Sequence, residues 1–286
     1  MTPEEEEQIR REFEASRKQG HEQQPQHQGP ELFQTNAFSN IKHVIGVVSG
    51  KGGVGKSLVT GILATELMRA GKKVGILDAD ITGPSIPKMF GVSAQRITAM
   101  DEHFLIPATT DQGIKIVSTN LILEHETDPV IWRGPILMGV LKQFYEDVFW
   151  GDIDYLLVDM PPGTGDVPLT VFQSLPIEGV VIVSSPQDLV QMVVGKAVNM
   201  AAMMEVPVVG LVENMSYYVC PDCGKHLEPF GPSRAKSTAE AFGIDLLGQL
   251  PIDPAIAELC DKGTIERDLP QHLLDNAIQT IAEHDA

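Results

Sequence analysis

The segment GKGGVGKS, from Gly50 to Ser57, has the residue types and spacing of a phosphate-binding loop, GxxxxGK[ST]. Glycines let the backbone curl so that its N–H groups point at phosphate oxygens, and a following helix adds the partial positive charge of its N-terminus. Lys56 supplies a cation for the β- and γ-phosphates, and the Ser57 hydroxyl can ligate Mg²⁺. The sequence therefore predicts an ATP site made of Gly50, Lys51, Gly52, Gly53, Val54, Gly55, Lys56 and Ser57.

Carboxylates follow two apolar runs further along the chain. Asp78 and Asp80 end the run KVGILDAD, and Asp159 ends DYLLVD, just before the glycine-containing loop PPGTGD. A triphosphate site needs acids near the γ-phosphate to hold Mg²⁺ and to orient the attacking water. Asp80 and Asp159 are therefore candidate catalytic residues beside Lys56, and Asp78 is a candidate for structure or for coupling to the nucleotide state. A carboxylate that only caps a strand end is the alternative for each of them.

Cys220 and Cys223 form a CxxC pair within CPDCGKH, and two thiolates at this spacing can bind one soft metal together. A redox disulfide pair usually accompanies a thioredoxin-like βαβ unit, which is not recognisable here. A zinc site and a 4Fe–4S cluster both need four ligands. Because the chain has no second CxxC, both the zinc site and the cluster favour two chains that each supply two cysteines.

From residue 43 onward, short apolar runs alternate with longer helical stretches, which must position these residues. Runs such as 43–49 and 208–214 are apolar almost throughout, as expected of strands buried on both faces. Helical stretches include 57–70 and 269–283. This alternation predicts an α/β P-loop NTPase fold, with a mostly parallel sheet, helices on both faces and ligands beyond the carboxyl ends of the strands.

Composition divides the chain into a tail and one domain. Residues 1–40 are acidic and rich in Gln, His, Gly and Pro, a composition that cannot offset its ordering entropy by apolar burial. We expect a flexible tail over 1–40 and an ATPase domain over 41–286, with a CxxC metal-binding insertion near 216–231.

The bulk charge limits the partners. With 39 acidic and 21 basic residues the net charge is −18, which disfavours nucleic acid and anionic membranes as partners. Neither a secretory signal nor a membrane-spanning apolar run is recognisable, and three cysteines are too few for a disulfide framework. A cytoplasmic protein is therefore expected.

The early lysine, Lys51, gives the loop the form KGGVGKS, which resembles the deviant-Walker ATPases: the nitrogenase iron protein, MinD and the ParA proteins. In that group this lysine reaches the nucleotide of a partner subunit, so the resemblance implies a homodimer with two facing ATP molecules. It also implies that Asp80 positions the attacking water and that Asp159 contacts Mg²⁺ through water. Asn214 would read the base, and the segment containing Pro251 and Asp253 would lie along it. From the residues alone, Asn214 could equally be a turn residue at a strand end.

A larger set of motifs resembles the Mrp-type (ApbC-like) iron–sulfur carrier ATPases: KGGVGKS, LDADITGPSIPKMFG, WRGP, VDMPPGTGD, SPQD, VENMSYYVCPDCG and FGPSRA. The match runs almost continuously from about residue 40 to 270. It implies that a labile 4Fe–4S cluster bridges Cys220 and Cys223 of both subunits and is transferred to apo iron–sulfur proteins. ATP would act as the conformational control, with slow, switch-type hydrolysis. Cys260 lies outside the pair and is expected to be a small buried residue on a helix.

Two other functions compete with the carrier. A positioning ATPase like MinD or ParA would need a basic amphipathic C-terminal helix or an exposed basic cluster, and the C-terminal segment is acidic. A zinc-stapled dimer would use ATP as a switch without transferring a cluster. The metal content of the protein separates this function from the carrier.

Overall fold

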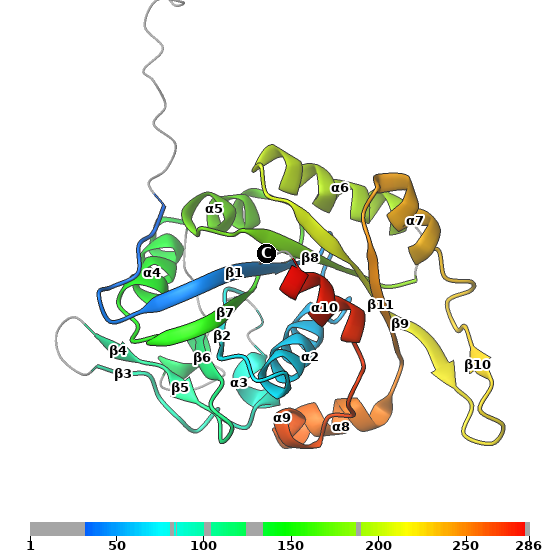
Figure 1. Cartoon of the computed structure of the whole chain (residues 1–286), viewed down its shortest axis with the longest axis horizontal. Coiled ribbons are helices and arrows are strands. Elements are labelled where there is room, and N and C mark those ends of the chain that lie inside the picture. The colour runs from blue at the N-terminus through cyan, green and yellow to red at the C-terminus, as the bar shows by residue number, and fades with distance from the viewer. Residues whose placement is uncertain are drawn as a thin grey trace, which may run out of the picture. The chain divides into compact units, whose positions relative to one another are not determined.

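The computed structural model describes residues 32–80, 83, 85–99, 104–123, 134–186 and 190–283. In this part of the chain a nine-stranded sheet has the order β10-β9-β8-β1-β7-β2-β6-β5, with β11 paired to β9 (Figure 1). The pairs β10–β9 and β5–β6 are antiparallel, and the other pairs in this sheet are parallel. The predicted α/β fold with a mostly parallel sheet is confirmed.

The strands of this sheet range from two to twelve residues, and the central strands β2 and β8 are buried throughout. The strands are β1 Asn40–Val48, β2 Val74–Asp78, β5 Ala108–Thr109, β6 Lys115–Ser118, β7 Asp152–Asp159, β8 Gly179–Ser184, β9 Val208–Val219, β10 His226–Leu227 and β11 Leu246–Pro251. A separate small hairpin is formed by β3 Thr98–Ala99 and β4 Leu105–Ile106.

Helices cover both faces of the sheet, and a separate hydrophobic core lies between the sheet and the helices on each face (Figure 1). The first face packs against α2 Lys56–Arg69, α3 Ile86–Met89, α8 Pro254–Lys262, α9 Ile265–Asp268 and α10 Asp275–Glu283. The second face packs against α4 Gly134–Glu146, α5 Asp166–Ser174, α6 Val190–Met203 and α7 Ala235–Phe242. A short 3₁₀ turn, Thr119–Leu121, follows β6.

Alternation within β1 explains why both faces carry a core. Ile45 and Val47 belong to one apolar cluster, and Val44 and Val48 belong to the other. Successive side chains of a strand point to opposite faces, so an apolar run fills both layers at once. Parallel pairing then places the carboxyl ends of β1, β2, β7 and β8 along one edge.

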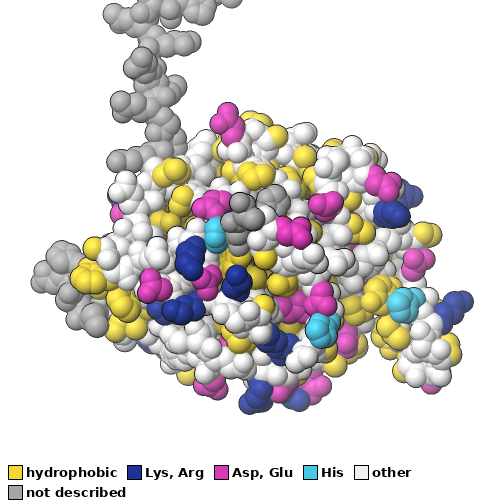
Figure 2. Space-filling model, viewed as in Figure 1, with side chains coloured by type: hydrophobic (Ala, Val, Ile, Leu, Met, Phe, Trp, Pro, Cys, Tyr) yellow, Lys and Arg dark blue, Asp and Glu magenta, His cyan; other side chains and the backbone are white. Residues whose placement is uncertain are grey.

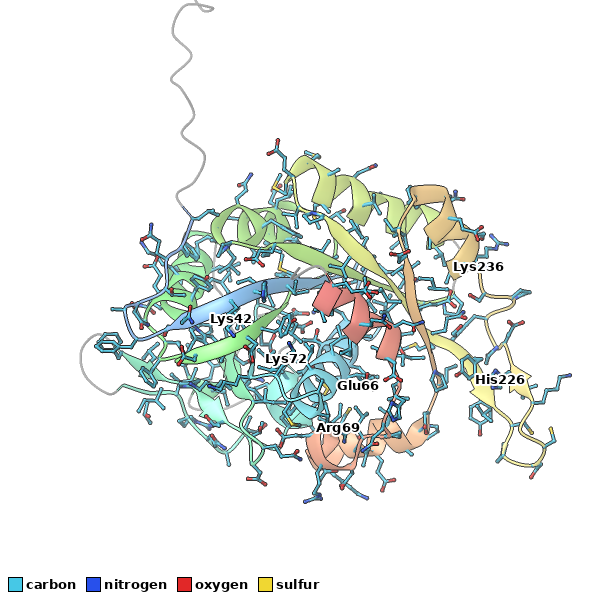
Figure 3. All side chains as sticks on the ribbon, in the orientation of Figure 1. Lys42, Glu66, Arg69, Lys72, His226 and Lys236 are labelled. Atoms are coloured by element: carbon cyan, nitrogen blue, oxygen red, sulfur yellow. The ribbon has the colours of Figure 1, made fainter. Side chains whose placement is uncertain are left out.

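The predicted helix over 269–283 is shorter in the structure, because α10 begins only at Asp275. Glu66, near the end of α2, accepts hydrogen bonds from the backbone N–H groups of Leu273 (2.7 Å) and Leu274 (3.0 Å). These bonds satisfy donors just before α10 and hold the preceding residues out of the helix. Figure 3 labels Glu66 on α2, the helix that lies beside α10.

Residues 32–39, which the sequence places in the tail, hydrogen-bond to the domain. The Phe33 N–H donates to Ser174, and the Asn36 amide donates to the carbonyls of Glu146 (2.7 Å) and Val148 (2.8 Å). The rest of the predicted tail lies outside the described residues. Within the described residues, none of the helices has the length and apolarity to cross a membrane.

Candidate functional site

The phosphate-binding loop joins the end of β1 to the start of α2, as predicted from the motif. Gly55 has φ +81° and closes the loop against β9: a Cβ at this position would lie 2.1 Å from Nδ2 of Asn214. Gly50 is equally confined, because a Cβ there would lie 2.4 Å from the carbonyl oxygen of Val193 in α6. Only glycine fits at these two positions, so the loop's shape is determined by its neighbours as well as by its own sequence.

Lys56 points at the two carboxylates predicted to be catalytic. Its Nζ lies 2.7 Å from Oδ1 of Asp159 and 3.6 Å from Oδ2 of Asp80. Asp159 reaches this position because β7 pairs with both β1 and β2. The sequence prediction that Lys56, Asp80 and Asp159 act at one site is therefore consistent with their placement.

Two hydroxyl groups complete the surroundings of Asp159. The Ser57 hydroxyl donates to Oδ2 (2.5 Å), and the Thr60 hydroxyl donates to Oδ1 (2.9 Å). Asp159 and Thr60 are fully buried. Ser57 was predicted as a Mg²⁺ ligand, whereas Thr60 was missed, because its partner lies 99 residues away in sequence.

Asp78 pairs with Asp159 across β2 and β7 and is fully buried. Burial raises the pKa of Asp78 well above its ordinary value, and the neighbouring charge of Asp159 raises the pKa further. The Ser118 hydroxyl (3.0 Å) and the Asp80 backbone N–H (3.2 Å) donate to its oxygens. The protonated form of Asp78 is therefore favoured by its surroundings.

A cavity of about 490 Å³ opens over the loop, within the usual range for ligand sites. It is lined by Ser49, residues 52–58, Asp80, Ser85, Met89, Pro162, Ala257, Cys260 and Asp261. Lys56 is buried, and among the described residues its ammonium has two carboxylates at ion-pair distance but no acceptor in hydrogen-bonding alignment. The unsatisfied N–H groups of the Lys56 ammonium suit a nucleotide phosphate, and the oxygen atoms of Ser57 and Asp159 suit Mg²⁺ as ligands.

The three residues predicted to contact the base make other contacts in the described structure. Asn214 is buried, and its Nδ2 donates to the carbonyl of Val54 (2.9 Å), so its amide holds the loop in place. Pro251 ends β11, and Asp253 caps α8 by accepting the N–H of Ala255 (2.8 Å). These three residues are not part of the cavity wall given above, and their contact with a base remains a prediction. Lys51 is half-buried within the loop, and its reach to a partner subunit also remains a prediction.

Cys220 and Cys223 lie in the tight turn between β9 and β10. The Cys220 N–H donates to the Lys225 carbonyl, and the Gly224 N–H donates to the Cys220 carbonyl, each at 2.9 Å. The N–H groups of Asp222 and Cys223 point at the Cys220 sulfur and, with the Cys223 thiol, lower the pKa of Cys220. Both thiols are free, and the turn favours the thiolate that a metal requires.

The end of β9, the turn with Cys220 and Cys223, and β10 form a hairpin, here called the cysteine hairpin, which projects away from the other strands of the sheet (Figure 1). Tyr217 and His226 stack across its two strands, with ring centroids 4.2 Å apart, and Figure 3 labels His226 there. Within the described residues, no three His, Cys, Asp or Glu side chains are grouped to hold a metal. One chain therefore offers two thiolates. Cys260 lies on α8, half-buried in the cavity wall, where the sequence predicted only a small buried residue.

Comparisons with known proteins identify relatives of this chain. The family model described as "ParA: NUBPL iron-transfer P-loop NTPase" matches residues 40–285. An iron-sulfur cluster carrier protein of Clostridium perfringens is 51% identical over 255 residues, covering 87% of this chain and 89% of the relative. One of Saccharolobus solfataricus is 49% identical, covering 79% and 76%.

Solved structures agree with this fold. A nucleotide-binding protein from Archaeoglobus fulgidus in complex with ADP is 44% identical with a TM-score of 0.73, covering 80% of this chain and 90% of the other. MinD of Aquifex aeolicus, at 19% identity and a TM-score of 0.56, shares the fold. The chain therefore belongs to the ParA/NUBPL family of iron-transfer P-loop NTPases.

Proposed function

We propose that this protein is an ATP-dependent carrier that holds a 4Fe–4S cluster between two copies of the chain and passes it to apo iron–sulfur proteins. The observation that carries the proposal is the position of the free pair Cys220 and Cys223. The pair lies in the turn that directly follows β9, the strand whose Asn214 hydrogen-bonds to the phosphate-binding loop. Iron-sulfur cluster carrier proteins at 49–51% identity support this function.

The number of thiolates favours a homodimer. A 4Fe–4S cluster takes four cysteine ligands, and the described part of one chain groups only two. A second copy supplies the other two if the two hairpins meet. The cluster would then be cargo that both subunits release together.

Exposed apolar side chains support contact through the face that carries both sites. Ile136, Val167 and Met192 are exposed at the starts of α4, α5 and α6, at the edge where the strands end. Val219, Leu227 and Phe230 are exposed on and beside the cysteine hairpin. Figure 2 shows hydrophobic side chains on this hairpin. A second copy placed over this face would cover both sets, and it would bring Lys51 towards its partner's nucleotide.

The loop and its acids supply the switch. Bound ATP would be held by the loop N–H groups and by Lys56, and Mg²⁺ by Ser57 and Asp159, where it would neutralise phosphate charge. Lys56 and Ser57 both contact Asp159 in this structure. Phosphate would therefore compete with Asp159 for Lys56 and shift the loop PPGTGD, which starts at Pro161. Asp80 would orient the attacking water, with slow hydrolysis suited to control of state.

A zinc-stapled dimer is the second candidate, because two thiolates with backbone N–H groups at the sulfur also suit zinc. A MinD-like positioning role is less well supported, since α10, with the sequence DNAIQTIAE, has no basic residue. The net charge of −18 also disfavours nucleic acid and membrane as partners. Cytoplasm is the proposed compartment, because reduced thiols persist there.

Cysteine variants test the carrier function. Anaerobic reconstitution of Cys220→Ala and of Cys223→Ala should leave no stable cluster, while nucleotide affinity stays within about threefold of the wild type, since neither residue lines the cavity. Cys260→Ser is the matched control and should bind iron and sulfide like the wild type. A stable cluster in the double variant Cys220→Ala/Cys223→Ala would remove the metal-site assignment, and zinc alone in the wild type would favour the stapled dimer.

A further inference from the structure

Two neighbouring residues of β9 contact different parts of the molecule. Asn214 donates to the Val54 carbonyl in the phosphate-binding loop (2.9 Å), and Glu213, the preceding residue, is completely buried. Successive side chains of a strand point to opposite sides, so this stretch has the loop on one side and Glu213 on the other. Cys220 follows six residues after Asn214 in the same chain segment.

Glu213 closes the root of the cysteine hairpin. Its Oε2 accepts hydrogen bonds from the hydroxyls of Ser216 (2.6 Å) and Ser233 (2.5 Å) and from Nε2 of Gln249 (2.9 Å). The Gln249 amide also bonds both hydroxyls, at 2.9 and 2.8 Å. Ser216 lies where the chain leaves for the cysteine turn, and Ser233 lies where it returns. We call Glu213, Ser216, Ser233 and Gln249 the hairpin clasp.

Burying a carboxylate costs free energy unless its oxygens accept hydrogen bonds, so Glu213 requires the donors of the clasp at this position. Within the described residues, the second oxygen, Oε1, is buried without a hydrogen-bond partner. The three bonds to Oε2 therefore carry the whole compensation for burial. They tie both legs of the hairpin and β11 to one atom.

Residues 214–216 form a bulge in β9. Glu213 faces Gln249 and Tyr217 faces Pro251, so three residues of β9 oppose a single residue of β11. Met215, in the middle, has φ +58°, which is strained for a side chain of its size. Its Cε lies 3.9 Å from where a Cβ of Gly55 would be. Through the bond from Asn214 to the Val54 carbonyl the bulge contacts the phosphate-binding loop directly, and the clasp closes its other side.

We propose, on the basis of the carrier function above, that Glu213 is a positioning residue that couples the phosphate-binding loop to the cysteine hairpin. When the loop adjusts to phosphate, Asn214 and Met215 move with it. Because the clasp joins the bulge to both legs of the hairpin, the cysteine turn follows. Without Glu213 the clasp keeps only the bonds from Gln249 to the two hydroxyls, and the hairpin's position becomes independent of the nucleotide.

Thiol reactivity tests this coupling without any cluster. The full, reduced and metal-free chain is treated with a maleimide, with and without Mg²⁺ and a non-hydrolysable ATP analogue, and modification of each cysteine is followed by peptide mass spectrometry. In the wild type the analogue should change the rates at Cys220 and Cys223 by roughly fivefold, the lower end of typical coupling between sites. In Glu213→Ala this ratio should fall to about one, with analogue affinity unchanged within about threefold.

Two further variants separate coupling from simple stability. Glu266→Ala removes another buried carboxylate, one hydrogen-bonded to Thr110 and far from β9 in sequence, and it should keep the wild-type ratio. Glu213→Gln keeps an acceptor and should restore part of the ratio. If Glu213→Ala does not fold, Ser233→Ala removes one clasp donor at a half-buried position and should lower the ratio instead.

An unchanged ratio in a folded Glu213 variant that binds the analogue, or no effect of the analogue on wild-type thiols, would overturn the coupling. Iron and sulfide binding by the same preparations is measured separately. Failure to bind a cluster would refute the carrier function and leave the thiol result standing. The two failures are therefore distinguishable.

Discussion

Replacing Gly55 by alanine should damage the nucleotide site through its contact with β9. The new Cβ would lie 2.1 Å from Asn214 Nδ2, a distance that no pair of heavy atoms tolerates without a bond. Asn214 would have to turn away and give up its 2.9 Å bond to the Val54 carbonyl in a buried place. The residue would also keep a φ of +81°, which disfavours any side chain.

The expected magnitude follows from these two losses. A left-handed conformation costs about 1–2 kcal/mol for alanine. Leaving a buried donor and acceptor unpaired costs about 1–3 kcal/mol more. Since each 1.4 kcal/mol is tenfold in affinity, the sum of about 2–5 kcal/mol predicts a roughly 30- to 4,000-fold loss of ATP affinity.

Gly53→Ala is the matched control within the same loop. Gly53 has φ +78°, and a Cβ there meets nothing within 4 Å. Only the conformational cost remains, so titration calorimetry should show a loss of about 5- to 30-fold. Adding Asn214→Ala to Gly55→Ala removes the collision, and the double variant should bind better than the two single losses predict. Equal affinities of the Gly53 and Gly55 variants, or additive losses in the double variant, would refute this reasoning.

Three further predictions concern the phosphate site and the cysteine turn. Lys56→Ala should abolish ATP binding in calorimetry and lower the free energy of unfolding by about 3 kcal/mol, because Asp159 stays buried without its cation. Cluster reconstitution should be unaffected. Undiminished ATP affinity would contradict the assignment of Lys56 to the phosphate site. Thr60→Val should slow ATP hydrolysis and destabilise the fold by about 1–3 kcal/mol in denaturant titrations, since Asp159 loses a buried donor; a silent variant would exclude Thr60 from the site. The folded turn lowers the pKa of Cys220, so its thiolate stabilises the folded state at pH values above the ordinary thiol pKa, and this contribution is lost as pH falls through the folded pKa. The pH midpoint for alkylation of Cys220 should lie below 9.0 in the folded protein and rise in urea. Equal midpoints in the two states would contradict the turn geometry.

Local patterns made the phosphate-binding loop predictable. Its glycines, Lys56 and Ser57 are adjacent in sequence, and the strand and helix on either side have clear apolar runs. The strand end at Asp159 was equally visible. The bond from Thr60 to Asp159 was not, because it depends on β7 lying beside β1, which no local pattern encodes.

The cysteine turn was found by its spacing, but its attachment was not. Glu213 falls within the apolar run 208–214. Of its three donors only Ser216 is near it in sequence, whereas Ser233 and Gln249 come from other segments of the chain. The two-residue strands β5 and β10 are too short for a periodic signal. The family resemblance implied that Asn214 reads the base, and this contact stays a prediction. The bond from Asn214 to the Val54 carbonyl was not predictable, because it depends on a glycine at position 55 that leaves room for the amide.

Metal content and mass, measured together, test the central claim most directly. The protein is purified without oxygen, analysed for iron, sulfide and zinc, and weighed in solution with and without ATP. A shared cluster predicts a dimer with about two iron and two sulfide per chain, lost together when Cys220 is replaced by alanine. A monomer that carries no metal, whether or not ATP is present, would contradict the account.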